Sequence, residues 1–99
     1  MSESIVATSM KYCMVCGKPA EHIHHLICGT ANRKNSTAAG LLAPLCEEHH
    51  REIHEGVNGS YFWSHALAEM AWIHDNQLPY EDREAVIERF IDKFGKNYL

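Results

Sequence analysis

The sequence predicts a small α+β domain, in which a turn, two short strands and a helix are followed by two further helices. Three observations predict this fold class. Cysteine and histidine pairs with metal-ligand spacing flank short β-branched and apolar runs in the first half of the chain. Apolar residues spaced by three and four positions fill the second half, which is typical of helices. A chain of 99 residues makes one domain with a modest core, which a bound metal can stabilise.

Composition divides this domain into three parts. Residues 1–12 carry no strong pattern and are expected to form an N-terminal arm. Residues 13–56 hold all four cysteines and six of the eight histidines, and residues 57–99 are expected to be a helical extension of the same domain. A hydrophobic content of 45% with 22% charged residues excludes a disordered or fibrous chain, and no apolar run is long enough to span a membrane.

The charge and cysteine usage limit the partners and the compartment. The formal net charge of −4 provides no overall basic footprint, so binding of nucleic acid requires a local cationic patch or a bound cation. The N-terminus shows no secretory signal, and we therefore expect a reducing, cytoplasmic location. In that compartment cysteines are metal ligands or core thiols more often than disulfides.

The first predicted elements are a turn and a strand. Cys13 and Cys16 are followed by glycine and proline, which predicts a tight turn that directs both sulfurs the same way. Residues 21–28 are rich in apolar and β-branched side chains and predict a strand. Because side chains alternate along a strand, His22 and His24 are expected on one face, and Ile23 and His25 on the other.

The next elements are a loop, a second strand and a helix. Residues 29–37 are polar and predict a loop, and residues 40–45 predict a short strand with Pro44 at an edge or an end. A helix is expected from Cys46 to Glu55, because two acidic residues lie in its first turn and Gly56 follows as a helix-ending residue.

Two helices are expected to complete the core. Ser60 is expected to cap a helix over residues 61–74, Pro79 interrupts the pattern, and a second helix over residues 80–94 ends at Gly95. The stripes expected to face the core are Trp63, Leu67, Met70 and Ala71 in the first helix, and Val86, Ile87, Phe90, Ile91 and Phe94 in the second.

Two ligand pairs predict a structural zinc site. Cys13 and Cys16 form one pair, and Cys46 and His49 form the other, three residues apart on the expected helix. Zinc takes four such ligands in tetrahedral geometry, so the ion would join the turn to the helix. Cys28 is left over and is expected to be a small buried thiol, with the fourth zinc position as its alternative role.

Four histidines outside this set predict a second metal site. His50 and His54 share one helical face, about 100° around the helix from His49. His24 and His25 are adjacent on a strand and therefore point to opposite sides. Three imidazoles with open coordination positions, beside a neutral histidine that can accept a proton, suit metal-assisted hydrolysis of phosphodiesters. The alternative is that these histidines are ordinary surface or core residues.

The segment from His24-His25-Leu26 to Leu45-Cys46-Glu47-Glu48-His49-His50-Arg51-Glu52-Ile53-His54 resembles the HNH endonucleases. The resemblance covers residues 13–56 and implies the ββα-metal, or His-Me, finger, in which two strands and a helix surround one catalytic divalent ion. The end of the chain, Phe90 to Tyr98, is similar to small phage-borne HNH proteins. The resemblance therefore implies a DNA endonuclease of a bacterial or phage-infected cell, with DNA and phage packaging or recombination proteins as partners.

The resemblance also implies residue roles. His24 would bind the catalytic ion with His50 and His54, and His25 would be the general base. Apart from the resemblance, Arg33 is placed with His25 in the catalytic set because Arg33 or Lys34 could hold a flanking phosphate, and the alternative is that both belong to a solvated loop. The expected catalytic ion is Mg²⁺ or Mn²⁺, with Ni²⁺ or Zn²⁺ as alternatives that suit three imidazoles. The implied products are a 5′-phosphate and a 3′-hydroxyl, formed by nicking if the protein acts as a monomer.

One position departs from the family pattern. Leu41 stands five residues before Cys46, where the family usually has an asparagine that orients the base histidine. Leucine makes no such hydrogen bond, so Asn32, Asn35 or a backbone carbonyl is expected to orient His25 instead. This departure keeps open a second interpretation, a non-catalytic zinc-stabilised module that binds DNA or serves as a scaffold in phage assembly.

Overall fold

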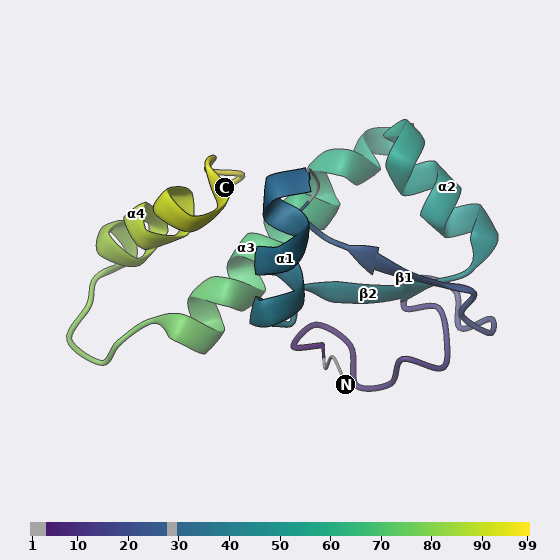
Figure 1. Cartoon of the computed structure of the whole chain (residues 1–99), viewed down its shortest axis with the longest axis horizontal. Helices are drawn as coiled ribbons and strands as arrows, with labels where there is room; N and C mark the ends of the chain where they lie inside the picture. The colour runs from purple at the N-terminus through teal and green to yellow at the C-terminus, as the bar shows by residue number, and fades with distance from the viewer. Residues whose placement is uncertain (1–3, 28–29) are drawn as a thin grey trace.

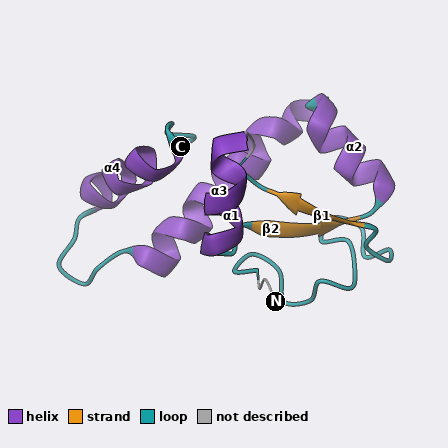
Figure 2. Cartoon of the chain, in the orientation of Figure 1, coloured by secondary structure: helices purple, strands orange, loops and turns teal. Residues whose placement is uncertain are grey.

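The computed structural model describes residues 4–27 and 30–99, so Cys28 lies outside the described residues. These residues form a mixed α+β fold with a two-stranded sheet and four α-helices (Figures 1 and 2). In chain order the elements are β1 (His22–His25), α1 (Thr30–Ala39), β2 (Leu42–Leu45), α2 (Glu47–Glu55), a 3₁₀ turn (Val57–Gly59), α3 (Ser60–Asn76) and α4 (Arg83–Phe94). No helix among the described residues is both long and apolar enough to cross a membrane.

The sheet is antiparallel and lies between α2 and the N-terminal arm (Figure 1). His24 pairs with Ala43, and His25 pairs with Leu42. The arm, residues 4–12, has no regular helix or strand but is tied to the fold, because the Ile5 amide donates to the Gly40 carbonyl at 2.9 Å. Both predicted strands are confirmed, and the two faces of β1 meet different parts of the molecule.

The expectation that the polar residues 29–37 form a loop is wrong, because most of this segment forms α1. Asparagine, serine and threonine favour helices only weakly, and tertiary contacts hold this one in place. The buried Ser36 hydroxyl donates to the Ile27 carbonyl at 3.0 Å. The side-chain amides of Asn32 and Asn35 donate to carbonyls of Phe94 and Lys93, at 3.1 Å and 3.2 Å. The helix therefore depends on the end of α4, which lies far along the chain.

The end of α1 explains the role of Leu41. Gly40 has a φ of 75°, and its amide donates to the Thr37 carbonyl while the Leu41 amide donates to the Ser36 carbonyl. This pair of hydrogen bonds is the Schellman arrangement, in which an apolar residue follows a left-handed glycine. The Leu41 side chain is fully buried in the core. Leu41 therefore ends a helix and packs in the core instead of beginning the second strand.

The helix predicted after the second strand is confirmed. Cys46 precedes the first residue of α2, and Gly56 ends the helix with a φ of 71°. The next helix begins one residue earlier than expected, because Gly59 occupies the cap position and Ser60 is already helical. The Ser60 hydroxyl instead donates to the Glu52 carbonyl at 3.0 Å and ties α3 to α2.

The stripe expected to bury α3 is wrong at Trp63 and Met70, whereas Leu67 is half-buried and Ala71 packs against the core. Trp63 and Met70 are 42% and 55% exposed, whereas His65 and Glu69 are fully buried. The C-terminal tail covers these two polar residues, since the Tyr98 amide donates to Glu69 Oε1 at 2.6 Å and the Tyr98 ring contacts the His65 ring. The rest of the buried face of α3 is apolar and includes Ala68, Trp72 and Ile73.

The predicted stripe of α4 is confirmed except at Ile91, which is 36% exposed, and Ile87 is partly buried against the core. Val86, Phe90 and Phe94 are buried, and Asp82 caps the helix by accepting from the Ala85 amide at 2.8 Å. Phe90 packs against Trp72 of α3, with ring centroids 5.6 Å apart. These aromatic side chains form the part of the core that α3 and α4 share.

Glu69 gives the fold a testable pH dependence. Burial raises the pKa of its carboxyl, the Tyr98 amide and Arg83 act in the opposite direction, and its Oε2 has no hydrogen-bond partner among the described residues. Because the pKa is raised in the folded state, the contribution of Glu69 to the free energy of unfolding is greatest below the ordinary pKa of 4.5. This contribution declines as the pH rises above that value. Glu69→Gln keeps an acceptor for Tyr98 and removes the charge, so the variant should gain stability relative to the unmodified protein between pH 4 and pH 7. Urea unfolding at several pH values measures this difference, and a difference that does not change with pH would contradict the assignment.

Candidate functional site

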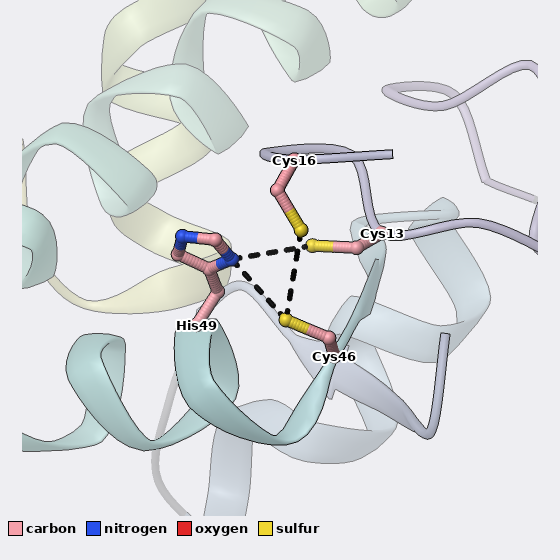
Figure 3. Close-up of side chains that lie close together, drawn as sticks. All are labelled: Cys13, Cys16, Cys46 and His49. Atoms are coloured by element: carbon pink, nitrogen blue, oxygen red, sulfur yellow. Dashed lines mark hydrogen bonds between the residues drawn. The ribbon is translucent and has the colours of Figure 1, made fainter. Parts of the chain in front are cut away.

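Three cysteines and one histidine meet at the start of α2. Cys13, Cys16, Cys46 and His49 each offer one ligand atom, and these four atoms lie within 4.8 Å of one another (Figure 3). The first two come from the turn before β1, in which Gly17 adopts a φ of 80°. Cys46 precedes α2, and His49 lies three residues later on its first turn. This set, the Cys₃His cluster, gathers the residues expected to bind zinc.

The spacing of these atoms fits a tetrahedral metal. The Cys16 and Cys46 sulfurs are 3.7 Å apart, and His49 Nδ1 lies 3.6 Å from Cys13 Sγ and 3.2 Å from Cys46 Sγ. Zinc–sulfur bonds of about 2.3 Å in a tetrahedron place neighbouring sulfurs about 3.8 Å apart. The donor set and its spacing are therefore compatible with a structural metal ion such as zinc.

The surroundings of Cys13 favour its metal-binding form, whereas contacts with Cys46 and Cys13 raise the pKa of His49. Burial opposes ionisation of Cys13, but hydrogen bonds from the backbone at Cys46, Cys16 and Val15 outweigh it and lower the pKa of the thiol to about 6. The thiolate, which is the form that binds metals, is thereby favoured near neutral pH. On the other side of the His49 ring, Nε2 lies 3.9 Å from Glu52 Oε2. A carboxylate on the second ring nitrogen helps to orient a metal-binding histidine.

A second group of ligand atoms lies between β1 and α2. His24, His50 and His54, here called the three-histidine cluster, also place one atom each within 4.8 Å of one another. The His50 and His54 Nε2 atoms are 3.1 Å apart. His24 is only 3% exposed, and its Nε2 has no hydrogen-bond partner among the described residues. A buried nitrogen without a partner is costly unless something binds it, so this donor set fits a metal ion.

Two members of the three-histidine cluster, His24 and His50, lie in surroundings that favour neutral donors. Burial is the main reason that the pKa of His24 falls to about 4, and the neighbouring His54 and His50 lower it further. Burial also lowers the pKa of His50. Neutral imidazole is the form that binds metals, and these shifts make it the dominant form at neutral pH.

His25 lies on the opposite face of β1 and contacts α1. Its Nε2 is 3.0 Å from the Thr37 hydroxyl oxygen, and the same hydroxyl donates its single hydrogen to the Arg33 carbonyl at 3.1 Å. The oxygen therefore accepts from His25, so Nε2 carries the ring hydrogen and Nδ1 is the basic nitrogen. Burial and the nearby Arg33 both lower the pKa of His25, which favours this neutral ring.

The two faces of β1 border one hollow. A cavity of about 370 Å³ is lined by the three-histidine cluster together with His25, Arg33, Ile23 and Ile27. His25 also lines a second cavity of about 880 Å³, which lies between the sheet and residues 4–10 of the arm. The described residues thus bring a candidate base, a cation and a set of metal ligands to the wall of one cavity.

The residue that contacts His25 differs from the sequence expectation. The amides of Asn32 and Asn35, expected near His25, donate to the end of α4 instead. Sequence reasoning missed Thr37 because it treated the segment as a loop. In a helix, Thr37 follows Arg33 by one turn, and the left-handed Gly40 with the apolar Leu41 was the available signal for that helix.

Comparison with known proteins finds one family. A family described as "Protein of unknown function (DUF968)" matches residues 5–65, more than half of the chain. The matched range includes both ligand clusters, His25, Arg33 and Thr37, and it ends before α4. No curated protein and no solved structure matches the chain.

Removal of one sulfur tests the Cys₃His cluster. Cys46→Ser keeps a good helix cap but removes a thiolate, so zinc binding and folding should be lost together. Structural zinc contributes on the order of 10 kcal/mol in small zinc-dependent domains, which is enough to abolish folding here. Metal content by mass spectrometry and far-UV circular dichroism measure both effects. Cys28→Ser is the matched control, and an equal loss of zinc in both variants would contradict the assigned ligand set.

Proposed function

The chain belongs to the family of unknown function DUF968, and we propose that it is a metal-dependent HNH endonuclease that hydrolyses DNA phosphodiester bonds. The observation that carries this proposal is the pair of adjacent histidines on β1. His24 forms a cluster with His50 and His54, while His25 contacts Thr37 and borders the same cavity as Arg33. In this proposal β1, β2 and α2 form the ββα-metal finger and zinc occupies the Cys₃His cluster.

The three-histidine cluster would hold the catalytic ion. A divalent ion bound by His24, His50 and His54 would supply Lewis-acid stabilisation of charge on the phosphate and the departing oxygen. The cluster contains imidazole nitrogens alone, which suit Ni²⁺ or Zn²⁺ better than Mg²⁺ or Mn²⁺, ions that favour oxygen ligands. Mg²⁺ and Mn²⁺ are both included in the test below.

The remaining residues would act on the water and the DNA. His25 would take a proton at Nδ1 from a water molecule as its oxygen forms a bond to phosphorus, while the bond from phosphorus to the 3′ oxygen breaks. The 3′ oxygen would leave with a proton from solvent, so the products carry a 5′-phosphate and a 3′-hydroxyl. Arg33, which lines the cavity, would hold a phosphate group of the bound strand.

Thr37 would fulfil the orienting role that Leu41 cannot. The Thr37 hydroxyl accepts from His25 Nε2 and so favours the tautomer in which Nδ1 is the basic nitrogen. This contact supports the catalytic interpretation against the non-catalytic alternative, which the buried Leu41 favours. A zinc-stabilised module that only binds DNA, or that serves as a scaffold, would bind without cleavage.

Plasmid nicking tests the proposed activity. Zinc-loaded protein should convert supercoiled plasmid to the nicked form when Mn²⁺ or Mg²⁺ is added, and it should do nothing without the added ion. His25→Ala should lower the rate roughly 100-fold or more, because general-base catalysis contributes at least that much. His74→Ala removes an exposed imidazole of α3 and is the matched control. If the folded, zinc-loaded protein cuts no DNA with any divalent ion, the proposal fails and the non-catalytic module is favoured.

The role of Thr37 is tested separately. Thr37→Val removes the acceptor for His25 at nearly constant volume, so kcat should fall about tenfold, the value of one net hydrogen bond, with little change in KM. Thr37→Ser should restore most of the rate, because it keeps the hydroxyl. Thr8→Val makes the same chemical change in the exposed part of the arm and should have no effect. Unchanged kcat in Thr37→Val would show that another group orients His25.

A further inference from the structure

A fourth imidazole lies against the three-histidine cluster. His22 belongs to the same face of β1 as His24, and its ring stacks on the His50 ring with centroids 4.3 Å apart and an interplanar angle of 15°. The other contacts of the His50 ring are edge contacts, with His24 at 5.4 Å and His54 at 4.5 Å. His50 is therefore the cluster member whose ring has a parallel ring on one face.

The stacked ring is itself held in place. His22 Nε2 donates to Glu47 Oε2 at 2.5 Å. Glu47 is the first residue of α2, and its amide donates to Glu21 Oε2 at 3.0 Å. A chain of contacts thus runs from the start of β1 through Glu47 to the face of the His50 ring.

We infer that His22 is a positioning residue for the metal site, and that Glu47 holds the His22 ring flat against His50 so that His50 Nε2 stays directed toward His24 and His54. The inference rests on the metal site of the proposed function, but it does not depend on DNA cleavage. An imidazole that is free to rotate about its Cβ–Cγ bond loses that freedom when it binds a metal, and this loss weakens binding. The stacked His22 ring restricts this rotation of His50 before a metal binds, so less freedom is lost on binding.

The contact also has an electrostatic component. A metal ion on His50 makes that ring more positive, and the face of a neighbouring aromatic ring attracts positive charge. The carboxylate of Glu47, bonded to the far edge of His22, strengthens this effect. Groups that hydrogen-bond to metal ligands change metal affinity by about 10- to 100-fold when they are removed, and we expect the lower end of this range for a stacked ring.

Cobalt titration of the full-length, zinc-loaded protein tests the inference. Co²⁺ bound by nitrogen has visible bands that differ from the sulfur-to-metal bands of cobalt in the Cys₃His cluster, so the two sites are observed separately. His22→Ala should weaken Co²⁺ binding at the three-histidine cluster at least tenfold. His22→Phe keeps a flat ring on His50 and should recover part of the affinity, and Glu47→Gln keeps an acceptor oxygen and should remain within a few-fold of the unmodified protein. His74→Ala is the control for loss of an exposed imidazole.

The outcomes separate this inference from the proposed function. Unchanged Co²⁺ affinity in His22→Ala overturns the inference, whatever the nuclease assay shows. If His22→Ala loses its bound zinc or its folded circular dichroism spectrum, the test uses His22→Phe in its place. The inference is then overturned if His22→Phe binds Co²⁺ no more tightly than a His50→Ala protein does. A cobalt site that depends on His22 in a protein that cuts no DNA supports the inference and removes the proposed activity. Failure of the unmodified protein to bind Co²⁺ outside the Cys₃His cluster overturns the metal site on which both rest.

Discussion

Ligand atoms from two segments some 30 residues apart converge at the Cys₃His cluster, and this convergence fixes the turn before β1 against the start of α2. Hydrophobic contacts are less suited to this task, because the turn exposes Cys16 and the first turn of α2 exposes its acidic residues. Once the start of α2 is fixed, the rotation of the helix places His50 and His54 over β1, about 100° around the axis from His49. The position of the second cluster is thus a consequence of the first.

β1 places two histidines that are adjacent in the sequence on opposite faces of the sheet. Its alternation sends His22 and His24 toward α2 and sends His25 toward α1 and the arm. Two neighbouring residues therefore experience different surroundings: His24 is buried among imidazoles, and His25 contacts a hydroxyl beside a guanidinium group. A strand of four residues is sufficient for this separation, since both faces of the sheet are covered.

Structural features could be predicted from the sequence where the contacts that determine them are local. The spacing within each ligand pair, the alternation of β1 and the glycine after α2 all act within a few residues, and the structure agrees with each expectation. The failures have distant causes. Asn32 of α1 donates to a carbonyl at the end of α4, and the amide of Tyr98 donates to the buried Glu69 of α3. Thr37 was missed for the same reason, because its role requires a helix that its own residues favour only weakly.

The dependence of α1 on α4 also affects the order in which the molecule is built. During synthesis the residues of both ligand clusters leave the ribosome long before Lys93 and Phe94, whose carbonyls receive the amides of Asn35 and Asn32. The nascent chain can therefore bind metal at the Cys₃His cluster while α1 still lacks its anchor. The contact between Thr37 and His25 is expected to become stable only when α4 has docked against α1, so that the proposed base reaches its working orientation late in folding.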